Sequence, residues 1–312
     1  MSAVNDTKFK SAVFFLTWIP GQKYVHNLWI SLPLCLMYVI SILGNSVILL
    51  IIKTDPSLHE PMYIFLSMLG ITDLGLLMST MPTILGIFLF NSREISFDAC
   101  FAQLFFIQSL QCIESSVLLL MAFDRYFAIH DPLRYASILT LPRIAKMGLV
   151  CVLRGVAVML PLPLLLKRFH YCQVNVLSHS YCMHQEVMKM ACSDISVNNI
   201  YGLFITVMTV LLDLLLIFLS YVMILKTVLS IASYKEFLRA LNTCVAHLCA
   251  VLLFYTPEFS LTLLHRFRKG SSPLLLIVLG NVNLLVPPLI NPIVYSMKSK
   301  HLRSRIIRVF VK

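Results

Sequence analysis

Seven long apolar stretches constrain this chain more than any other feature of its sequence. Each is at least 20 residues long and contains at most one charged side chain. A helix of about 20 apolar residues crosses the hydrocarbon core of a bilayer, so each stretch can span a membrane. The pattern predicts an all-α membrane protein, a bundle of seven transmembrane helices. The stretches are Leu28–Ile52, Met62–Asn91, Ala99–Phe123, Met147–Leu166, Ile195–Leu225, Ala240–Leu264 and Gly270–Met297.

The composition leaves little room for a separate soluble domain. Only 12% of the residues are charged, whereas soluble domains carry about 25%. We expect a single seven-transmembrane domain over residues 1–312, with an extracellular segment (1–27), the helix bundle (28–297) and a cytoplasmic tail (298–312). The tail alternates basic and apolar residues, which is typical of a short amphipathic helix on the inner membrane surface. The alternative is a disordered basic tail.

Three features orient the bundle. With the C-terminus inside, 14 Lys and Arg residues lie on the cytoplasmic side and 10 outside, as the positive-inside rule requires. Asn5 begins a glycosylation sequon that is then extracellular. Cys100, Cys172, Cys182 and Cys192 also fall on the outer side, where disulfides persist. The net charge of +11 therefore reflects topology and attraction to anionic inner-leaflet lipid, and we do not expect nucleic-acid binding.

The third span carries polar residues along one face. Gln111, Glu114 and Arg125 lie within about 60° of one another on a helix of 3.6 residues per turn. Charges avoid lipid, so this face should point into the bundle. Arg125 lies at the cytoplasmic end beside Asp124, which is a ready partner for it. A helix bundle with two states could use this pair as a polar lock.

Two buried acids have similar expected depth. Glu114 lies roughly 16 Å above Arg125, and Asp73 lies about 20 Å from the inner end of the second span. Two carboxylates at one level repel unless one is protonated or a cation lies between them. Asn45, Ser79 and Asn291 are further oxygen donors. A small sodium site and a protonated, hydrogen-bonded pair both explain the pattern.

Channels, transporters and membrane enzymes are the rival classes. A transporter would show repeated halves or helices broken at matching positions, and no internal repeat is visible. An enzyme would need convergent catalytic groups, whereas the buried acids are spread over different depths. We therefore expect no enzymatic activity and no cofactor beyond a sodium ion.

Several short motifs carry a family resemblance over essentially the whole chain. They are Gly44-Asn45, Leu58–Tyr63, Met121–Tyr126, Ala128–Tyr135, Ser220-Tyr221, Arg239–His247 and Pro288–Tyr295. With these motifs the chain resembles an olfactory receptor, within the rhodopsin-like G-protein-coupled receptors. The loop from Phe169 to Ser193 and the segment His265–Phe267 resemble the class I (fish-like) branch. The chain has Arg239 and Ala246 where members of the family usually have Lys and Ser.

The resemblance implies roles for individual residues. It makes Asp73 and Glu114 the acids of a sodium site. It pairs Cys100 with Cys182, and Cys172 with Cys192. It assigns G-protein coupling and activation to residues at the inner end of the bundle, namely Asp124, Arg125, Tyr126, Tyr221, Asn291, Pro292 and Tyr295. The prolines of the seventh span allow a kink that moves during activation, and a static kink is the alternative.

The ligand is expected in a mostly apolar cavity with few polar groups, in the outer half of the bundle. The resemblance to class I receptors implies an odorant that is a short or medium carboxylic acid held by Arg266. Glu258 and Thr262 precede Arg266 on one broad face, so Glu258 could instead select alcohols, ketones or an amine, or both charges could be structural. The candidate residues are Gln108, Gln111, Cys112, His184, Gln185, Tyr201, Ile205, Tyr255, Glu258, Phe259, Thr262 and Arg266.

The resemblance also implies partners and location. We expect a stimulatory G protein of the olfactory type, a rise in cyclic AMP, and membrane lipid around the bundle. The receptor should lie in the plasma membrane with its N-terminus outside, in the cilia of sensory neurons. A receptor for a metabolite outside the nose is the alternative function.

Overall fold

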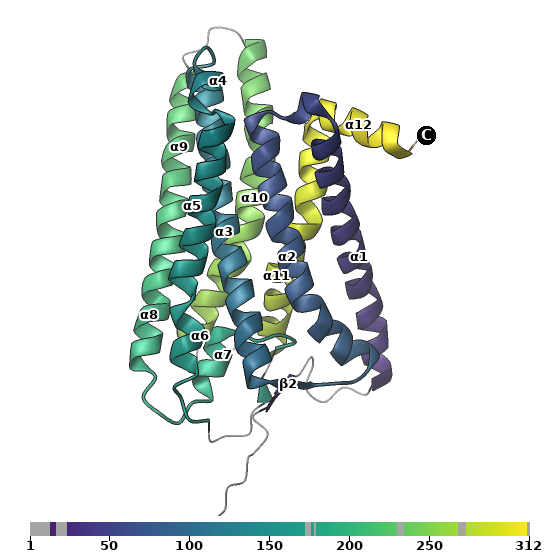
Figure 1. Ribbon diagram of the computed structural model, residues 1–312, viewed down its shortest axis with the longest axis vertical. Helices are drawn as coiled ribbons and strands as arrows, with labels where there is room; N and C mark the ends of the chain where they lie inside the picture. The colour runs from purple at the N-terminus through teal and green to yellow at the C-terminus, as the bar shows by residue number, and fades with distance from the viewer. Residues whose placement is uncertain are drawn as a thin grey trace, which may run out of the picture.

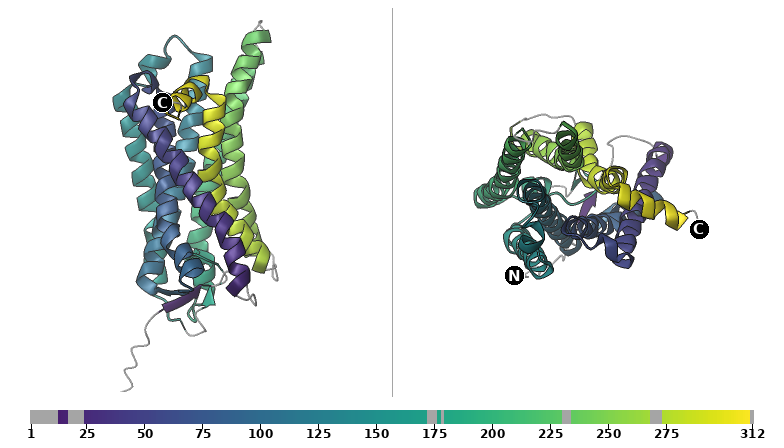
Figure 2. Two further views of the ribbon diagram at one scale, coloured as in Figure 1. Left: turned by 90° about the vertical axis from the view of Figure 1, so that its right-hand side faces the viewer. Right: turned by 90° about the horizontal axis from the view of Figure 1, so that it is seen from above.

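Seven helical spans run side by side along the long axis of the molecule (Figures 1 and 2). The computed structural model describes residues 13–16, 24–171, 176–177, 179–229, 234–267 and 273–310. Figure 1 has the inner end uppermost, with α4 and α12, and the outer end below, with β2 and α7. The predicted seven-helix bundle is confirmed.

Five spans are single helices, and two are divided. The single helices are α1 (Tyr24–Thr54), α2 (Pro61–Leu89), α3 (Phe97–His130), α10 (Tyr234–Phe267) and α11 (Pro273–Lys298). The fourth span consists of α5 (Leu141–Met159) and α6 (Pro161–Leu166). The fifth consists of α8 (Ser196–Thr206), the π-helical turn η2 (Val207–Leu211) and α9 (Leu212–Leu229).

The prolines explain part of this geometry. Pro161 has no N–H to donate, and the fourth span divides there. In α11, Pro292 cannot donate to the carbonyl of Pro288, which lies four residues earlier. The Asn45 amide of α1 donates to that carbonyl instead, at 2.9 Å. A backbone group freed by proline inside a membrane must be satisfied by a neighbouring helix, and here α1 provides the donor.

The two helices meet closely at the same level. A Cβ added at Gly44 of α1 would lie 3.2 Å from the Pro292 ring. Glycine at this position therefore lets α1 approach the kinked part of α11 closely enough for the Asn45 hydrogen bond.

Short helices complete the inner end, where η1 (Pro56–Leu58) and α4 (Tyr135–Ile138) lie in loops. The tail forms α12 (Lys300–Phe310), which turns away from the bundle (Figure 1). Leu302 of α12 is fully buried, and Arg305 pairs with Asp55 at 2.6 Å. Ser57 of η1 and Arg305 both lower the pKa of Asp55. The predicted amphipathic helix is confirmed, and the disordered alternative is wrong.

A small sheet covers the outer end of the bundle. Its strands are β1 (Val13–Leu16), β2 (Glu94–Ser96) and β3 (Val176–Leu177), with β1 in the middle. Strand β1 pairs antiparallel with β2 and parallel with β3. Phe14 of β1 is fully buried and stacks on Phe97 at 4.2 Å between ring centroids. No strand was expected in this N-terminal segment.

Candidate ligand cavity and switch residues

Two small cavities lie in the outer half of the bundle, and they share three side chains. Gln108 and Gln111 of α3 and Glu258 of α10 line both of them. The cavity nearer the membrane centre, the deep cavity, measures about 40 Å³ and also has Cys112, Ser115, Met159, Ile205, Thr206, Thr209, Val210 and Phe254 in its wall. The cavity below the outer loop, the loop cavity, measures about 30 Å³ and is completed by Ile107, Tyr181, Cys182, Met183, Gln185, Leu261, Thr262, His265, Asn283 and Leu284.

Glu258 is the charged group at the junction of the two cavities. Asn283 of α11 donates a hydrogen bond to one of its oxygens at 2.7 Å. Pro257 precedes it inside α10, at a position where a helix loses one backbone hydrogen bond. Among the described lining side chains, none belongs to a Lys or Arg. Within that set, the two cavities therefore combine a carboxyl group with amides, hydroxyls and the His265 imidazole.

Some predicted ligand residues lie elsewhere. His184, in α7 (His184–Lys189), is buried beside Asn198, with 2.9 Å between Nε2 and Oδ1. The Tyr201 hydroxyl donates to the carbonyl of Val158, on the side of the fourth span. Phe259 is 47% exposed on the outer surface of the bundle, because one residue along a helix rotates a side chain by about 100° from Glu258. Neither cavity includes these three residues in its wall.

Tyr255 belongs to a buried polar network beside the deep cavity. Its hydroxyl lies 2.7 Å from the Ser115 hydroxyl, which in turn donates to Asp213 at 2.6 Å. Arg154 reaches the same Asp213 oxygen from α5, at 2.8 Å. The network joins α3, α5, α9 and α10 at the level of the π-helical turn. Arg154 and Asp213 are therefore partners of one another and not part of the cavity wall.

Arg266 lies one turn beyond Thr262, and its side chain is outside the described residues. The position of its guanidinium therefore remains a prediction. Cys172 and the sequon residue Asn5 are also outside the described residues, although Cys192 takes part in a disulfide. Glycosylation at Asn5 stays a prediction.

The two buried acids share one amide. Asn291 of α11 donates to Oδ2 of Asp73 at 3.1 Å and is also a hydrogen-bond neighbour of Glu114. Asp73 Oδ1 and Glu114 Oε1 are buried and have no hydrogen-bond partner within the described part of the chain. Of the other two expected oxygen ligands, Asn45 donates from its amide nitrogen to the Ser41 and Pro288 carbonyls, and the Ser79 hydroxyl donates to the Leu76 carbonyl. Two free carboxyl oxygens at one site suit a small cation or a shared proton.

The inner end of α3 carries the expected ion pair. Arg125 lies 3.1 Å from Asp124, whose side chain is 1% exposed. The hydroxyl of Tyr135, from α4, donates to the other oxygen of Asp124 at 2.6 Å. Tyr126 packs beside His130, with 5.0 Å between ring centroids.

The inner ends of the later spans are joined to α3 by side chains. The Tyr221 hydroxyl lies 2.7 Å from Nδ1 of His247, and Nε2 of that ring lies 2.9 Å from the Leu118 carbonyl. Tyr295 packs in the same apolar cluster and reaches the sulfur of Met121 at 3.9 Å. His247 is therefore a hydrogen-bonding bridge between α9, α10 and α3.

Comparison with known proteins decides the family. The sequence model of the family described as "Olfactory receptor" matches residues 34–312. The chain belongs to the olfactory receptor family. Human olfactory receptor 51G2 is 58% identical over 98% of this chain and 97% of its own length, and human olfactory receptor 51E1 is 50% identical over 98% and 96%. These relatives are consistent with the class I branch.

A solved structure supports the fold separately. Squid rhodopsin superposes with a TM-score of 0.76, over 94% of this chain and 88% of that protein, at 17% identity. The olfactory receptor is therefore a multi-pass plasma-membrane protein with the rhodopsin fold and no enzymatic activity. Its family implies a small-molecule odorant and a G protein as partners.

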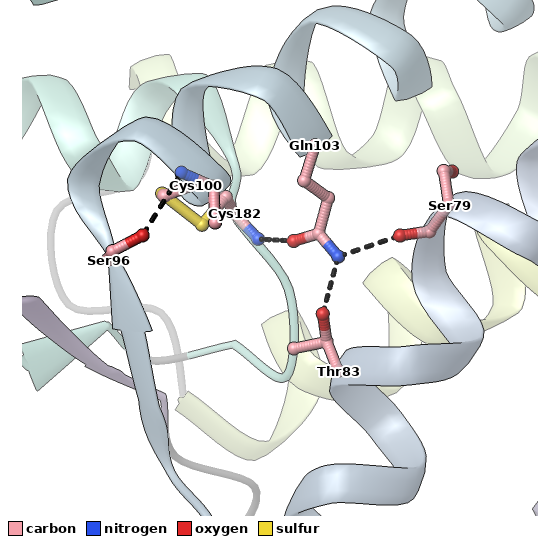
Figure 3. The surroundings of a disulfide bond; sticks show 7 residues. Ser79, Thr83, Ser96, Cys100, Gln103 and Cys182 are labelled. Carbon is pink, nitrogen blue, oxygen red and sulfur yellow. Dashed lines mark hydrogen bonds between the residues drawn. A yellow bond between two sulfur atoms is a disulfide. The ribbon is translucent and has the colours of Figure 1, made fainter.

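The receptor's outer loop is attached to α3 at Cys100, which forms the expected disulfide with Cys182. Figure 3 shows that Gln103, one turn along α3, reinforces the link. Its carbonyl accepts from the Cys182 backbone at 3.0 Å, while its amide donates to the Ser79 carbonyl and the Thr83 hydroxyl of α2. Gln103 was not predicted, because its role requires α2, α3 and the loop to meet.

Larger hollows in the olfactory receptor lie on its lipid-facing surface. One of about 380 Å³ lies between α3 and α5, and one of about 290 Å³ lies between α1, α11 and α12. Val150 and Leu43, in their walls, are each more than half exposed. Such grooves suit lipid chains, whereas the two smaller cavities are inside the bundle and have the polar groups that orient a ligand.

Proposed function

We propose that this olfactory receptor binds a small organic odorant across the deep and loop cavities and signals through a stimulatory G protein, which raises cyclic AMP. The observation that carries the proposal is the position of Glu258. It lies at the junction of both cavities, on the helix whose inner part carries His247 and contacts Tyr221. A ligand that displaces Glu258 therefore acts on the same helix that contributes to the inner-end contacts.

The ligand is expected to be small. Cavities of about 40 and 30 Å³ are comparable with the space of one or two water molecules. Rotation of Gln108, Gln111 and Glu258 would join the two volumes, because these are the side chains common to both walls. Short molecules need the least displacement of these side chains.

Two ligand classes have separate support. A carboxylic acid is supported by the shared helix face, since Glu258 and Thr262 both line the loop cavity and Arg266 follows one turn further out. A guanidinium offers a planar fork for two carboxylate oxygens. A neutral or amine ligand is supported by Glu258 itself, which accepts from alcohols and amines and would repel a carboxylate when ionised. The side chains that the structure describes favour the Glu258 anchor.

A cyclic-AMP assay separates the two classes. Cells co-expressing the receptor and a stimulatory G protein are challenged with matched short acids, alcohols, ketones and amines. Loss of an anchoring charged hydrogen bond costs about 2 kcal/mol or more, which is a roughly 30-fold rise in EC50. An acid response lost in Arg266→Ala but kept in Arg168→Ala, an exposed arginine on the same side, establishes the acid receptor.

The opposite result assigns the anchor to Glu258. Alcohol or amine responses lost in Glu258→Gln, but kept in the exposed control Asp194→Asn, establish a receptor for neutral or basic ligands. A metabolite that acts through the same anchor would support the alternative of a metabolite receptor. If no ligand class raises cyclic AMP while the receptor is present at the surface, the stimulatory coupling is wrong.

We also propose that Asp73, Glu114 and Asn291 bind a sodium ion. The support is the pair of carboxyl oxygens, Asp73 Oδ1 and Glu114 Oε1, that are buried without a hydrogen-bond partner in the described chain. Replacing sodium with a bulky organic cation should change agonist potency in wild type and in the exposed control Glu60→Gln, and should have no effect in Glu114→Gln. An unchanged potency in wild type would favour the shared proton.

A further inference from the structure

Three metal-binding side chains meet at the outer end of the bundle. His179 follows β3 in the outer loop, Glu186 lies in α7, and His265 lies in the last turns of α10. One ligand atom from each lies within 4.8 Å of the other two. The three residues are brought together only by the fold, because His265 is far along the chain from the other two.

The hydrogen bond made by His265 determines which of its nitrogens is free. Nδ1 lies 3.0 Å from the Leu261 carbonyl, and a carbonyl can only accept, so Nδ1 carries the proton. Nε2 then faces Glu186 Oε1 at 3.5 Å. In a neutral ring this places a lone pair opposite a carboxylate, and only a cation between them, a proton or a metal ion, makes the contact favourable. Metal-binding histidines commonly donate their second N–H to a backbone carbonyl in this way.

His179 supplies a second imidazole with unused nitrogens. Its side chain is fully buried, and neither ring nitrogen has a hydrogen-bond partner among the described residues. A neutral imidazole nitrogen with a free lone pair can bind a metal without losing a proton. A buried nitrogen without a partner costs about 1–3 kcal/mol, which a bound ion would offset.

The helix opposite leaves room for this ring. A Cβ added at Gly280 of α11 would lie 3.3 Å from Nδ1 of His179 and 2.8 Å from the Tyr181 hydroxyl. The His179 and His265 rings face one another with 5.7 Å between centroids. The glycine therefore lets α11 pack closely against His179, next to the His265 ring.

Glu186 provides the charge and has one competitor. Its Oε1 lies 3.5 Å from the free Nε2 of His265, so the carboxylate and the imidazole nitrogen face the same point. Lys189 binds the same oxygen, Oε1, at 3.1 Å and is half exposed. A metal ion must share Glu186 with this ammonium group or displace it into solvent.

We propose that His179, Glu186 and His265 form a zinc site that joins the outer loop to the outer end of α10. Two imidazoles and one carboxylate are a typical zinc set, with a fourth position for water or a ligand atom. Calcium and magnesium prefer oxygen ligands and are disfavoured by the two nitrogens. His265 also lines the loop cavity, so the ion would lie at the edge of the ligand site.

Cobalt absorption tests the site directly. Full-length receptor, purified in detergent through an epitope tag without histidines, is titrated with Co²⁺, and Zn²⁺ is then added to displace it. Wild type should give one saturable visible absorption band that Zn²⁺ removes. His179→Ala, Glu186→Gln and His265→Ala should each weaken binding by about tenfold or more, since even outer partners of metal ligands contribute 10- to 100-fold.

Two further variants keep the test decisive. His170→Ala removes an exposed histidine on the same face and should bind Co²⁺ as wild type does. Lys189→Gln removes the competing ammonium and should tighten binding about two- to fivefold, the size of an exposed ion pair. A variant with weaker Co²⁺ binding is interpreted only if it elutes as a folded monomer. Tighter Co²⁺ binding by Lys189→Gln cannot result from misfolding. No band in wild type, or equal affinity in Lys189→Gln and wild type, overturns the site.

A signalling measurement extends the test to regulation, and this extension rests on the proposed function. Micromolar Zn²⁺ should change the odorant response of wild type and His170→Ala, and leave that of His179→Ala unchanged. The absorption assay needs no odorant, so a failed odorant response and a failed metal site give different results. Equal zinc effects in wild type and His179→Ala would overturn the regulatory role.

Discussion

The outer and inner ends of this receptor are held together by different kinds of contact. At the outer end, a disulfide from Cys100 to Cys182 and a three-stranded sheet join the N-terminal segment and the loop to α3. At the inner end, side-chain hydrogen bonds join the helices, as in Tyr135 to Asp124 and Tyr221 to His247. The disulfide is covalent and the sheet is held by backbone hydrogen bonds, whereas these inner contacts are exchangeable side-chain hydrogen bonds.

The difference suits a receptor whose two ends have different tasks. A cavity keeps its shape when the loop above it is fixed, and Gln103 adds a hydrogen bond to that fixation. A switch needs contacts of about 1–3 kcal/mol that new partners can replace. Four tests of the two ends and of the centre between them follow, beginning with the largest expected effect.

Arg125→Ala should abolish the cyclic-AMP response while leaving the receptor at the cell surface. Arg125 is paired with Asp124, and the expected polar lock has to open for coupling to the G protein. The exposed Arg143→Ala is the control for loss of positive charge at the same end. A normal cyclic-AMP response in Arg125→Ala would show that signalling does not depend on the ion pair of Arg125 with Asp124.

Removal of the outer disulfide should strongly reduce stability. The bond joins residues separated by 82 positions, and a loop of this length contributes about 4 kcal/mol in the chain-entropy account. Cys100→Ser with Cys182→Ser should therefore lower surface expression and the melting temperature of purified receptor. Cys35→Ser, at a free cysteine, is the control. Equal melting temperatures for the two variants would show that the outer disulfide does not stabilise the receptor.

The buried pair of Arg154 and Asp213 tests the centre of the bundle. Arg154→Leu leaves the carboxylate of Asp213 buried without its charged partner, which costs about 3–5 kcal/mol. Replacing both residues with Leu should recover most of the loss, because apolar replacement of a buried pair is often neutral. Thermal unfolding of purified receptor measures both variants. If the double variant is as unstable as Arg154→Leu, the hydroxyl network with Ser115 and Tyr255 contributes more to stability than the ion pair does.

The smallest expected effect comes from removing a single tyrosine hydroxyl, at the inner end in one variant and at the outer end in another. Tyr135→Phe removes a hydrogen bond to the charged Asp124, which is worth about 1.5 kcal/mol, and should raise basal cyclic AMP up to roughly tenfold. Tyr171→Phe removes a hydrogen bond to the Leu166 carbonyl at the outer end and should leave basal signalling unchanged. Equal basal activity in the two variants would contradict the division between a fixed end and a switching end.

Much of the architecture was predictable because hydrophobicity is a local property of the chain. The seven spans and the amphipathic α12 both follow from the cost of placing charges in lipid. Most helices extend a few residues beyond the apolar stretches, since polar residues continue a helix once it leaves the hydrocarbon core. The sheet was missed because β1 is four residues long and pairs with distant segments.

The cavity was predicted less completely for a geometric reason. Spacing along α10 correctly placed Glu258 and Thr262 on one face, but Phe259 faces outward and Tyr201 turns toward the fourth span. Asn283 and Ser115 were missed, because their importance depends on which side chains of other helices they meet. The rotation and the kinks of the helices determine those contacts, and neither can be predicted from the spacing of residues along one helix.

The sequence by itself therefore determined the number of spans, their orientation in the membrane and the charged positions that must be buried. The energy of transferring polar groups into lipid depends on each segment alone, so these properties can be read one segment at a time. The tertiary structure decided which buried groups meet: Glu258 with Asn283, Asn45 with the Pro288 carbonyl, and His179 with Glu186 and His265. These contacts join residues distant in sequence, and their distances follow only from the packing of the whole bundle.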